Sequence, residues 1–171
     1  MKIVVLQGSP RKMGNTQFLV EGFKEGAEKV GHSVEILNVG NMKVAGCLGC
    51  EYCHTKGNGE CVQKDEMQNL YPRLMEADMI VFASAVYYFN FTGQLQNVIS
   101  RFYSKGTMPA KKYALIVSSY SPDVYSGIVE TYKHIVNYSN ASDVGIKCIC
   151  GSEQKTDVNR KEMVEFGESI K

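Results

Sequence analysis

Ile-Val-Val-Leu-Gln-Gly-Ser-Pro-Arg-Lys-Met-Gly-Asn-Thr, residues 3–16, is the stretch of sequence that decides the fold of this chain. The apolar run Ile3–Leu6 predicts a buried strand, and apolar residues recur with helical spacing from Phe18 to Val30. The turn between them is rich in hydroxyls, small residues and positive charge. A buried strand that passes through such a turn into a helix is the repeating unit of a parallel α/β sheet.

The turn itself has the chemistry of a phosphate-binding loop. Free N–H groups at a helix start, together with the helix dipole, favour an anion. Ser9 and Thr16 can donate hydroxyls, and Arg11 can pair with a phosphate through two N–H groups. The turn has neither the Gly-Lys-Ser/Thr of nucleoside triphosphatases nor the G-x-G-x-x-G dinucleotide motif. An ordinary polar loop, in which Gly14 makes the turn and Asn15 caps the helix, is the alternative.

Strand and helix patterns alternate along the rest of the chain. Strands are expected at Lys2–Leu6, Ser33–Leu37, Met79–Ala83, Tyr113–Ser118 and Val144–Cys150. Helices are expected at about Asn15–Val30, from Asp65 with Gln68 completing a capping box, along Leu95–Phe102, at Ser126–Tyr138 and at about Arg160–Ile170. This alternation predicts one flavodoxin-like α/β domain over residues 1–171, a three-layer sandwich with a five-stranded parallel sheet in the order 2-1-3-4-5.

Composition narrows the classes of partner and compartment. The formal net charge of +1 gives no basic excess for nucleic acid, and no apolar stretch approaches the length of a membrane span. No charged-then-apolar leader precedes the first strand, so a cytoplasmic protein without a membrane partner is expected. Six cysteines in that compartment are expected to be reduced, catalytic or metal-bound rather than paired in disulfides.

A second loop supplies aromatic side chains at the same edge of the predicted sheet. Residues 84–93 follow the third strand, and four of the five positions in Tyr87–Phe91 are aromatic. Exposed aromatic residues in a loop line a pocket or a subunit interface. A phosphate cradle beside an aromatic wall suits flavin mononucleotide (FMN) better than a sugar phosphate. The alternative is that these rings only fill space against neighbouring helices.

At this point the chain resembles a known family. The G-S-P-R-x-x-G-N-T loop, the S-x-V-Y-x-x-N-x-x-G-Q-L segment at Ser84–Leu95 and the cysteine-rich loop between them are similar to the NADPH-dependent FMN reductase-like flavoproteins, which include iron–sulfur flavoproteins. The resemblance covers about residues 1–120 well. Two departures are Ala85, where the family usually has proline, and residues 118–122, where a glycine-rich loop is common.

The resemblance implies a set of FMN contacts on three loops. The phosphate-loop residues are Ser9, Arg11, Met13, Gly14, Asn15 and Thr16. The isoalloxazine-lining residues are Ala85, Val86, Tyr87, Tyr88, Phe89 and Asn90, and Ser118 and Tyr120 close the far edge of the ring. The chemistry would take place on the flavin, so no catalytic side chain is expected.

A cysteine-rich insertion at residues 41–62 carries Cys47, Cys50, Cys53 and Cys61 in the spacing C-x2-C-x2-C-x7-C. This spacing is typical of a [4Fe-4S] cluster. Free thiols or a redox pair, and a zinc site that His54 could join, are the alternatives. Cys148 and Cys150, in the last predicted strand, are expected to be small core residues.

Three functions follow from these patterns. The first is an FMN-dependent NAD(P)H oxidoreductase that passes electrons to a small acceptor such as a quinone, a nitro compound or a flavin. The second is an iron–sulfur flavoprotein that carries single electrons from ferredoxin through a cluster on the cysteine loop. The third is a flavin-binding redox sensor without enzymatic activity. A homodimer or homotetramer is expected, because a second subunit often completes the flavin site in the resembling family.

Overall fold

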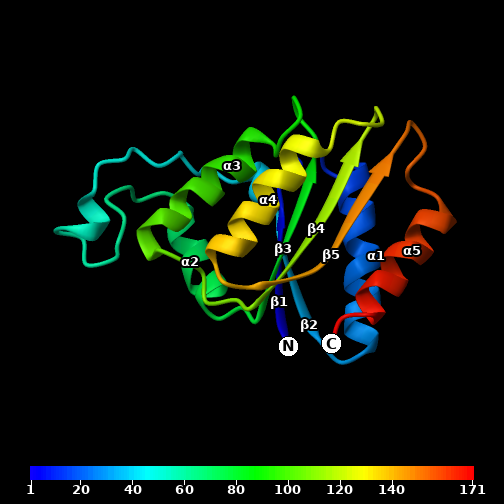
Figure 1. The fold of residues 1–171 in the computed structure, drawn as a ribbon, viewed down its shortest axis with the longest axis horizontal. Helices are drawn as coiled ribbons and strands as arrows, with labels where there is room; N and C mark the ends of the chain where they lie inside the picture. The colour runs from blue at the N-terminus through cyan, green and yellow to red at the C-terminus, as the bar shows by residue number, and fades with distance from the viewer.

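Five parallel strands form the centre of the molecule in a computed structural model that describes residues 1–171 (Figure 1). The strands are β1 Lys2–Gln7, β2 Ser33–Leu37, β3 Met79–Ala85, β4 Lys112–Ser119 and β5 Ser142–Cys150. Their order in the sheet is β2-β1-β3-β4-β5, as the sequence predicts. The carboxyl ends of all five strands therefore meet at one edge, and both chain termini lie at the opposite edge (Figure 1).

Helices cover both faces of the sheet. α1 (Asn15–Lys29) and α5 (Asp157–Glu168) pack on one face, and α2 (Met67–Met75), α3 (Gly93–Ser100) and α4 (Ser126–Tyr138) pack on the other (Figure 1). Glycine permits the close approach of the first pair, since a Cβ atom at Gly26 would lie 1.9 Å from the carbonyl oxygen of Val164. None of the helices combines the length and the apolar character that a membrane crossing requires.

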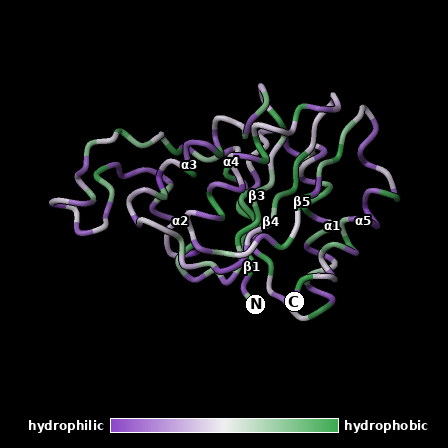
Figure 2. Tube along the Cα trace, viewed as in Figure 1, coloured by the Kyte–Doolittle hydropathy of each residue, from purple (hydrophilic) through white to green (hydrophobic).

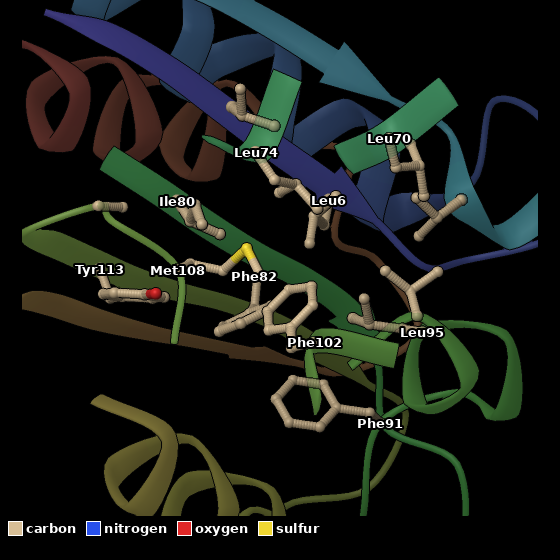
Figure 3. Packing of buried hydrophobic residues seen from close by; sticks show 14 of the residues in the cluster. Leu6, Leu70, Leu74, Ile80, Phe82, Phe91, Leu95, Phe102, Met108 and Tyr113 are labelled. Atoms are coloured by element: carbon tan, nitrogen blue, oxygen red, sulfur yellow. The ribbon is translucent and has the colours of Figure 1, made fainter. Parts of the chain in front are cut away.

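The core is divided by the sheet into two apolar layers. Figure 2 shows the apolar colouring concentrated along the central strands. The layer beneath α2, α3 and α4 is built around Phe82, whose ring is 5.8 Å from that of Phe91 and 5.9 Å from that of Tyr113 (Figure 3). These strands are apolar on both faces because helices cover both faces, as parallel sheets require.

Two of the predicted helices are wrong in detail. α2 begins at Met67, and Asp65 accepts its backbone N–H at 3.1 Å. Gln68 does not complete a capping box, because its side chain donates to the carbonyl of Gln63. The predicted helix through Phe102 ends at Ser100 and continues as the 3₁₀ segment η3, Arg101–Lys105. At this change from α-helix to 3₁₀ helix, the side chain of Arg101 forms hydrogen bonds with distant segments of the chain.

The expectation that Cys148 and Cys150 are core residues is also wrong. Both are exposed, because β5 is an edge strand of the sheet. The remaining short 3₁₀ segments are η1, Val39–Asn41, and η2, Tyr52–His54. The latter lies in the cysteine loop, which extends away from the sheet beyond α3 (Figure 1).

Candidate functional site

A pocket of about 380 Å³ opens at the carboxyl ends of β1, β3 and β4. Four chain segments line it, namely the loop and helix start after β1, the loop after β3, the end of β4 and the loop after β5. The lining residues are Ser9, Arg11, Gly14, Asn15, Thr16, Ala85, Val86, Tyr87, Ser118, Ser119, Tyr120, Gly151, Ser152 and Gln154. This is the edge where ligands bind in open parallel sheets.

Hydrogen bonds between the loops hold the walls of this pocket together. The N–H of Gly8 donates to the carbonyl of Ala83 at 2.7 Å, which joins the ends of β1 and β3. The buried hydroxyl of Thr92 donates to the carbonyl of Gly8 at 2.7 Å and caps α3 by accepting the N–H of Leu95. The two predicted ligand loops therefore form one connected unit.

The start of α1 presents unpaired backbone donors to the pocket. Gly14 is the N-cap, and the N–H groups of Asn15, Thr16 and Gln17 donate to no other group of the protein. Arg11 forms no ion pair, so its guanidinium is free to meet an anion. Three free donors, the helix dipole and one free guanidinium can together neutralise a phosphate dianion.

The back of the phosphate loop lies directly against the segment that follows β2. A Cβ atom at Gly40 would lie 2.4 Å from the carbonyl oxygen of Ser9, a distance that no side chain can occupy. On the other side, the hydroxyl of Thr16 is 2.8 Å from that of Ser118, which ties α1 to the end of β4. The loop is thereby held in place from two directions.

The aromatic loop forms a tight turn with unusual backbone angles. Tyr87 and Asn90 exchange both backbone hydrogen bonds, at 3.0 and 3.1 Å. The two residues between them, Tyr88 and Phe89, have φ values of 50° and 69°. Bulky residues avoid this left-handed region, so the turn stores strain. The start of α4 presses on it, since a Cβ atom at Gly127 would lie 2.6 Å from the Phe89 carbonyl oxygen.

The structure brings together ten of the fourteen predicted FMN contacts. They are Ser9, Arg11, Gly14, Asn15, Thr16, Ala85, Val86, Tyr87, Ser118 and Tyr120. Met13, Tyr88, Phe89 and Asn90 do not line the pocket. Tyr88 is 96% exposed, and the amide of Asn90 is engaged by the N–H of Phe91 and the side chain of Gln96. For all fourteen residues, contact with FMN stays a prediction.

Sequence reasoning missed the segment after β5, which supplies Gly151, Ser152 and Gln154; Ser119 lies within the expected segment between Ser118 and Tyr120. The amide nitrogen of Gln154 donates to the carbonyls of Ser119 and Gly151, while its buried Oε1 has no partner. The sequence did contain one signal that the segment after β5 belongs to the site. In a parallel sheet the loop after every strand emerges at the same edge, so the polar run after β5 belongs to the candidate site.

A larger groove of about 700 Å³ runs along the outside of the phosphate loop. It shares Arg11 with the first pocket and contains Met13 and Lys12. Two of its cations are already engaged, because Lys155 donates to the carbonyl of Met13 and Arg160 pairs with Glu25. The groove offers no aromatic loop opposite its cations, so the smaller pocket is the better flavin site.

The four cysteines of the insertion line a separate cavity of about 10 Å³. All four are free thiols, with Cys53 and Cys61 buried and Cys47 and Cys50 exposed. No group of three or more His, Cys, Asp or Glu side chains is close enough to hold a metal ion. The cysteines therefore face one common space without forming an assembled ligand set.

Arg101 lies at the wall of this cysteine cavity. Its Nη1 donates to Asp65 Oδ2 at 2.8 Å and to the carbonyl of Ala45 at 3.0 Å. Burial disfavours the charge of Arg101, but the hydrogen bond to Asp65 and nearby negative groups raise its pKa above the usual range. Burial likewise disfavours the Asp65 carboxylate, yet the bonds from Arg101 and the N–H of Ala45 hold the pKa of Asp65 below its usual range.

Residues 1–161 match the family described as NADPH-dependent FMN reductase. The chain belongs to this family. The match includes the phosphate loop, the strained aromatic turn and the cysteine insertion, so the three features that the sequence singled out occur together in a family member. Family membership also agrees with the sheet order and with the position of the pocket at the strand ends.

Individual relatives of this FMN reductase family member divide into two groups. An iron–sulfur flavoprotein of Archaeoglobus fulgidus is 38% identical over 112 residues, which are 66% of this chain and 50% of the relative. One of Clostridioides difficile is 25% identical over 99% of this chain and 74% of the relative. Among solved structures, NAD(P)H:quinone oxidoreductase from Methanothermobacter marburgensis has the same fold, with a TM-score of 0.73, 16% identity and coverage of 98% and 92% of the two chains. The chain spans about half the length of the curated relatives that it matches at 37–38% identity.

Proposed function

We propose that the pocket at the strand ends binds FMN. The observation that carries this proposal is the meeting of two kinds of wall in one pocket: the free donors at the start of α1 with Arg11, and the segment Ala85–Tyr87. The first wall suits the phosphate, and the second suits a flat ring. The unpartnered Oε1 of Gln154 is available to accept a hydrogen bond from the ligand.

The activity that we propose is oxidation of NAD(P)H with transfer of the electrons to a small acceptor. Bound FMN would supply the redox chemistry by accepting a hydride and releasing electrons. The protein would bind and orient the flavin: the α1 donors hold the phosphate, Val86 and Tyr87 flank the ring, and Ser118 and Tyr120 bound its far edge. Membership in the FMN reductase family supports this activity. The proposed acceptor of the electrons is a quinone, a nitro compound or a flavin.

A titration with FMN and an assay of NAD(P)H oxidation test this function. Purified protein should quench the fluorescence of added FMN with one site per chain and should then oxidise NADPH or NADH in the presence of a quinone. Arg11→Gln should weaken FMN binding by about tenfold or more, because one charged hydrogen bond contributes about 1.5–3 kcal/mol. Lys12→Gln is the matched control, since Lys12 does not line the pocket. Equal effects of both variants, or no FMN binding, would contradict the proposal.

We propose as the second candidate an electron carrier with a [4Fe-4S] cluster on the cysteine loop. Four free thiols around one cavity are the donor set that such a cluster needs, and the relatives at 38% identity are named iron–sulfur flavoproteins. The cavity of about 10 Å³ is too small for a cluster, so the segment between Cys47 and Cys61 must widen when a cluster binds, while the hydrogen bonds at Ala45 and Gln63 hold the two ends of the loop together. Gly46, Gly49, Gly57 and Gly59 lie in the loop and permit such a change.

Iron and acid-labile sulfide analysis after anaerobic reconstitution tests this candidate. About four of each per chain are expected, together with reduction by ferredoxin. Cys53→Ser should abolish uptake, whereas Cys148→Ser, a cysteine outside the loop, should leave it unchanged. Protein that binds FMN but takes up no iron or sulfide would contradict the electron carrier and leave the flavin oxidoreductase unaffected.

We also propose that the protein is a homodimer or homotetramer. Tyr88, Phe89 and Tyr120 expose aromatic rings beside the mouth of the flavin pocket, and a second subunit would cover them. Light scattering of FMN-loaded protein should give a mass of two or four chains. A mass of one chain at micromolar concentration would contradict this assembly.

A further inference from the structure

Arg101 is the one charged residue of the protein whose side chain is almost completely buried, with 1% exposed. A buried cation is costly unless it is paired and hydrogen-bonded. The ion pair with Asp65 satisfies the charge, and the carbonyls of Ala45 and Gln63 accept two further hydrogen bonds at 3.0 and 3.4 Å. Every one of these partners flanks the segment that carries the four cysteines, Cys47–Cys61.

These contacts close the two ends of the cysteine loop on each other. Ala45 precedes Cys47 by two residues, and Gln63 follows Cys61 by two. Asp65 adds a second link by accepting the N–H of Ala45 at 3.0 Å, and the side chain of Gln63 donates to the carbonyl of Gly46. The first and the last cysteine are therefore brought together by a guanidinium that comes from η3, about 40 residues further along the chain.

One donor of this guanidinium has no partner. Arg101 Nε is buried and makes no hydrogen bond, although the other two nitrogens of the group are engaged. The residue lines the cavity that all four loop cysteines share. A buried N–H group without a hydrogen-bond partner destabilises the folded protein by about 1–3 kcal/mol. We therefore expect an acceptor for the Nε–H of Arg101. The acceptors that line this cavity are the four cysteine sulfurs and the side-chain oxygens of Glu51, Gln63, Tyr103 and Ser104. Among the thiols, Cys61 lies near enough to Arg101 to influence its pKa.

We propose that Arg101 is a positioning residue for the cysteine site, and that its Nε–H donates a hydrogen bond to a sulfur atom of the loaded site. This inference rests on the second candidate function, the cluster. Hydrogen bonds to sulfur stabilise negative charge on a cluster and raise its reduction potential, because the reduced form carries one more negative charge. Arg101 would thus close the loop with Nη1 and Nη2 and tune the bound group with Nε.

The test compares Arg101→Lys with Gln63→Ala. Lysine keeps the positive charge beside Asp65 but has no counterpart of Nε. Gln63→Ala loosens the end of the loop, by removing the bond to Gly46, and leaves Arg101 unchanged. Each protein is reconstituted anaerobically with ferrous iron and sulfide and is checked for FMN binding. Retention of iron against a chelator and the midpoint potential of the bound iron are then measured.

Arg101→Lys should retain iron roughly tenfold less well than the wild-type protein, which is the effect of one charged hydrogen bond. Its midpoint should fall by about 59 mV, the one-electron equivalent of a tenfold change. Gln63→Ala should keep the wild-type midpoint even if it loses some iron. Equal losses of iron in both variants with unchanged midpoints would reduce Arg101 to a structural role and overturn the inference.

A second variant keeps the inference testable if Arg101→Lys does not fold. Asp65→Asn leaves Nε in place and removes the charge that neutralises Arg101, so the midpoint should rise; an unchanged or lower midpoint would overturn the inference. Wild-type protein that binds FMN but no iron would remove the cluster and this role of Arg101 together, while leaving the flavin oxidoreductase intact. Wild-type protein that takes up iron while the Arg101 variants behave as wild type would refute the inference alone.

Discussion

The strained turn at Tyr88 should be relieved by a single substitution, Tyr88→Asn. A bulky side chain in the left-handed region costs about 1–2 kcal/mol, whereas asparagine tolerates that region and is favoured in turns of this kind. Tyr88 is 96% exposed, so almost no burial is lost. The substitution should stabilise the FMN-free protein by about 1 kcal/mol, which is about 2–4 °C in melting temperature for a chain of this size.

The neighbouring Phe89 has the same backbone strain, but its substitution gives the opposite result because the side chain is half-buried. Its φ is 69°, but the residue is 54% exposed and therefore keeps roughly half of its surface buried. Burial of half of a phenylalanine side chain, whose surface is about 200 Å², stabilises the folded protein by about 2–2.5 kcal/mol. That loss exceeds the strain relieved, so Phe89→Asn should destabilise the protein by about 1 kcal/mol.

Thermal and urea unfolding of FMN-free protein measure the change in stability that each of the two substitutions causes. A titration with FMN measures the change in FMN affinity. Strain of this kind is retained where the conformation serves a function, so Tyr88→Asn should weaken FMN binding by about threefold to tenfold while raising stability. The control is Tyr138→Asn, which removes a comparably exposed tyrosine from a residue without a positive φ. A Tyr88→Asn variant that is no more stable than the control would refute the strain argument. An unchanged FMN affinity would remove Tyr88 from the flavin site.

Three further predictions concern the supports of the two sites. Gly40→Ala should weaken FMN binding by about tenfold or more, because its Cβ would lie 2.4 Å from the Ser9 carbonyl oxygen and the phosphate loop must shift; calorimetric titration would detect this. Thr92→Val should cost about 2 kcal/mol in urea unfolding, since it removes both the cap of α3 and the bond to the Gly8 carbonyl, while Thr55→Val, on the exposed cysteine loop, should cost much less. The lowered pKa of Asp65 makes a contribution to stability that is complete above about pH 5 and disappears as the pH falls through about 4 and below. The wild-type protein should therefore lose more stability between pH 5 and pH 3 than Asp65→Asn, and parallel curves would contradict this.

The alternation of apolar strands and amphipathic helices was sufficient to predict the sheet and its order. Short strands that are apolar on both faces require helices on both sides, and right-handed crossovers leave few arrangements. The phosphate loop was also readable, because its donors are backbone groups at a helix start, which a local pattern of residues determines. For the same reason Ser9, Arg11 and Thr16 lie together in the pocket as predicted.

Side-chain placement beyond the local turn was not readable. The sequence predicts that Tyr88 and Asn90 contact the flavin. In the structure a tight turn leaves Tyr88 exposed and engages the Asn90 amide internally, so neither residue lines the pocket, and their contact with FMN stays a prediction. Cys148 and Cys150 have the pattern of core residues, yet their strand lies at the edge of the sheet. Which strand lies at an edge, and which part of it a helix covers, depends on the whole assembly and not on the strand itself.

The sequence by itself determined the fold, the phosphate loop and the four cysteines of the insertion, because each depends on residues that are close along the chain. Only the tertiary structure decided that Gln154 joins the pocket from the loop after β5, and that Arg101 closes the cysteine loop from about 40 residues away. Both contacts join segments that no periodicity or spacing links. They form because burial leaves their polar atoms only the partners that the packed chain brings within hydrogen-bond distance.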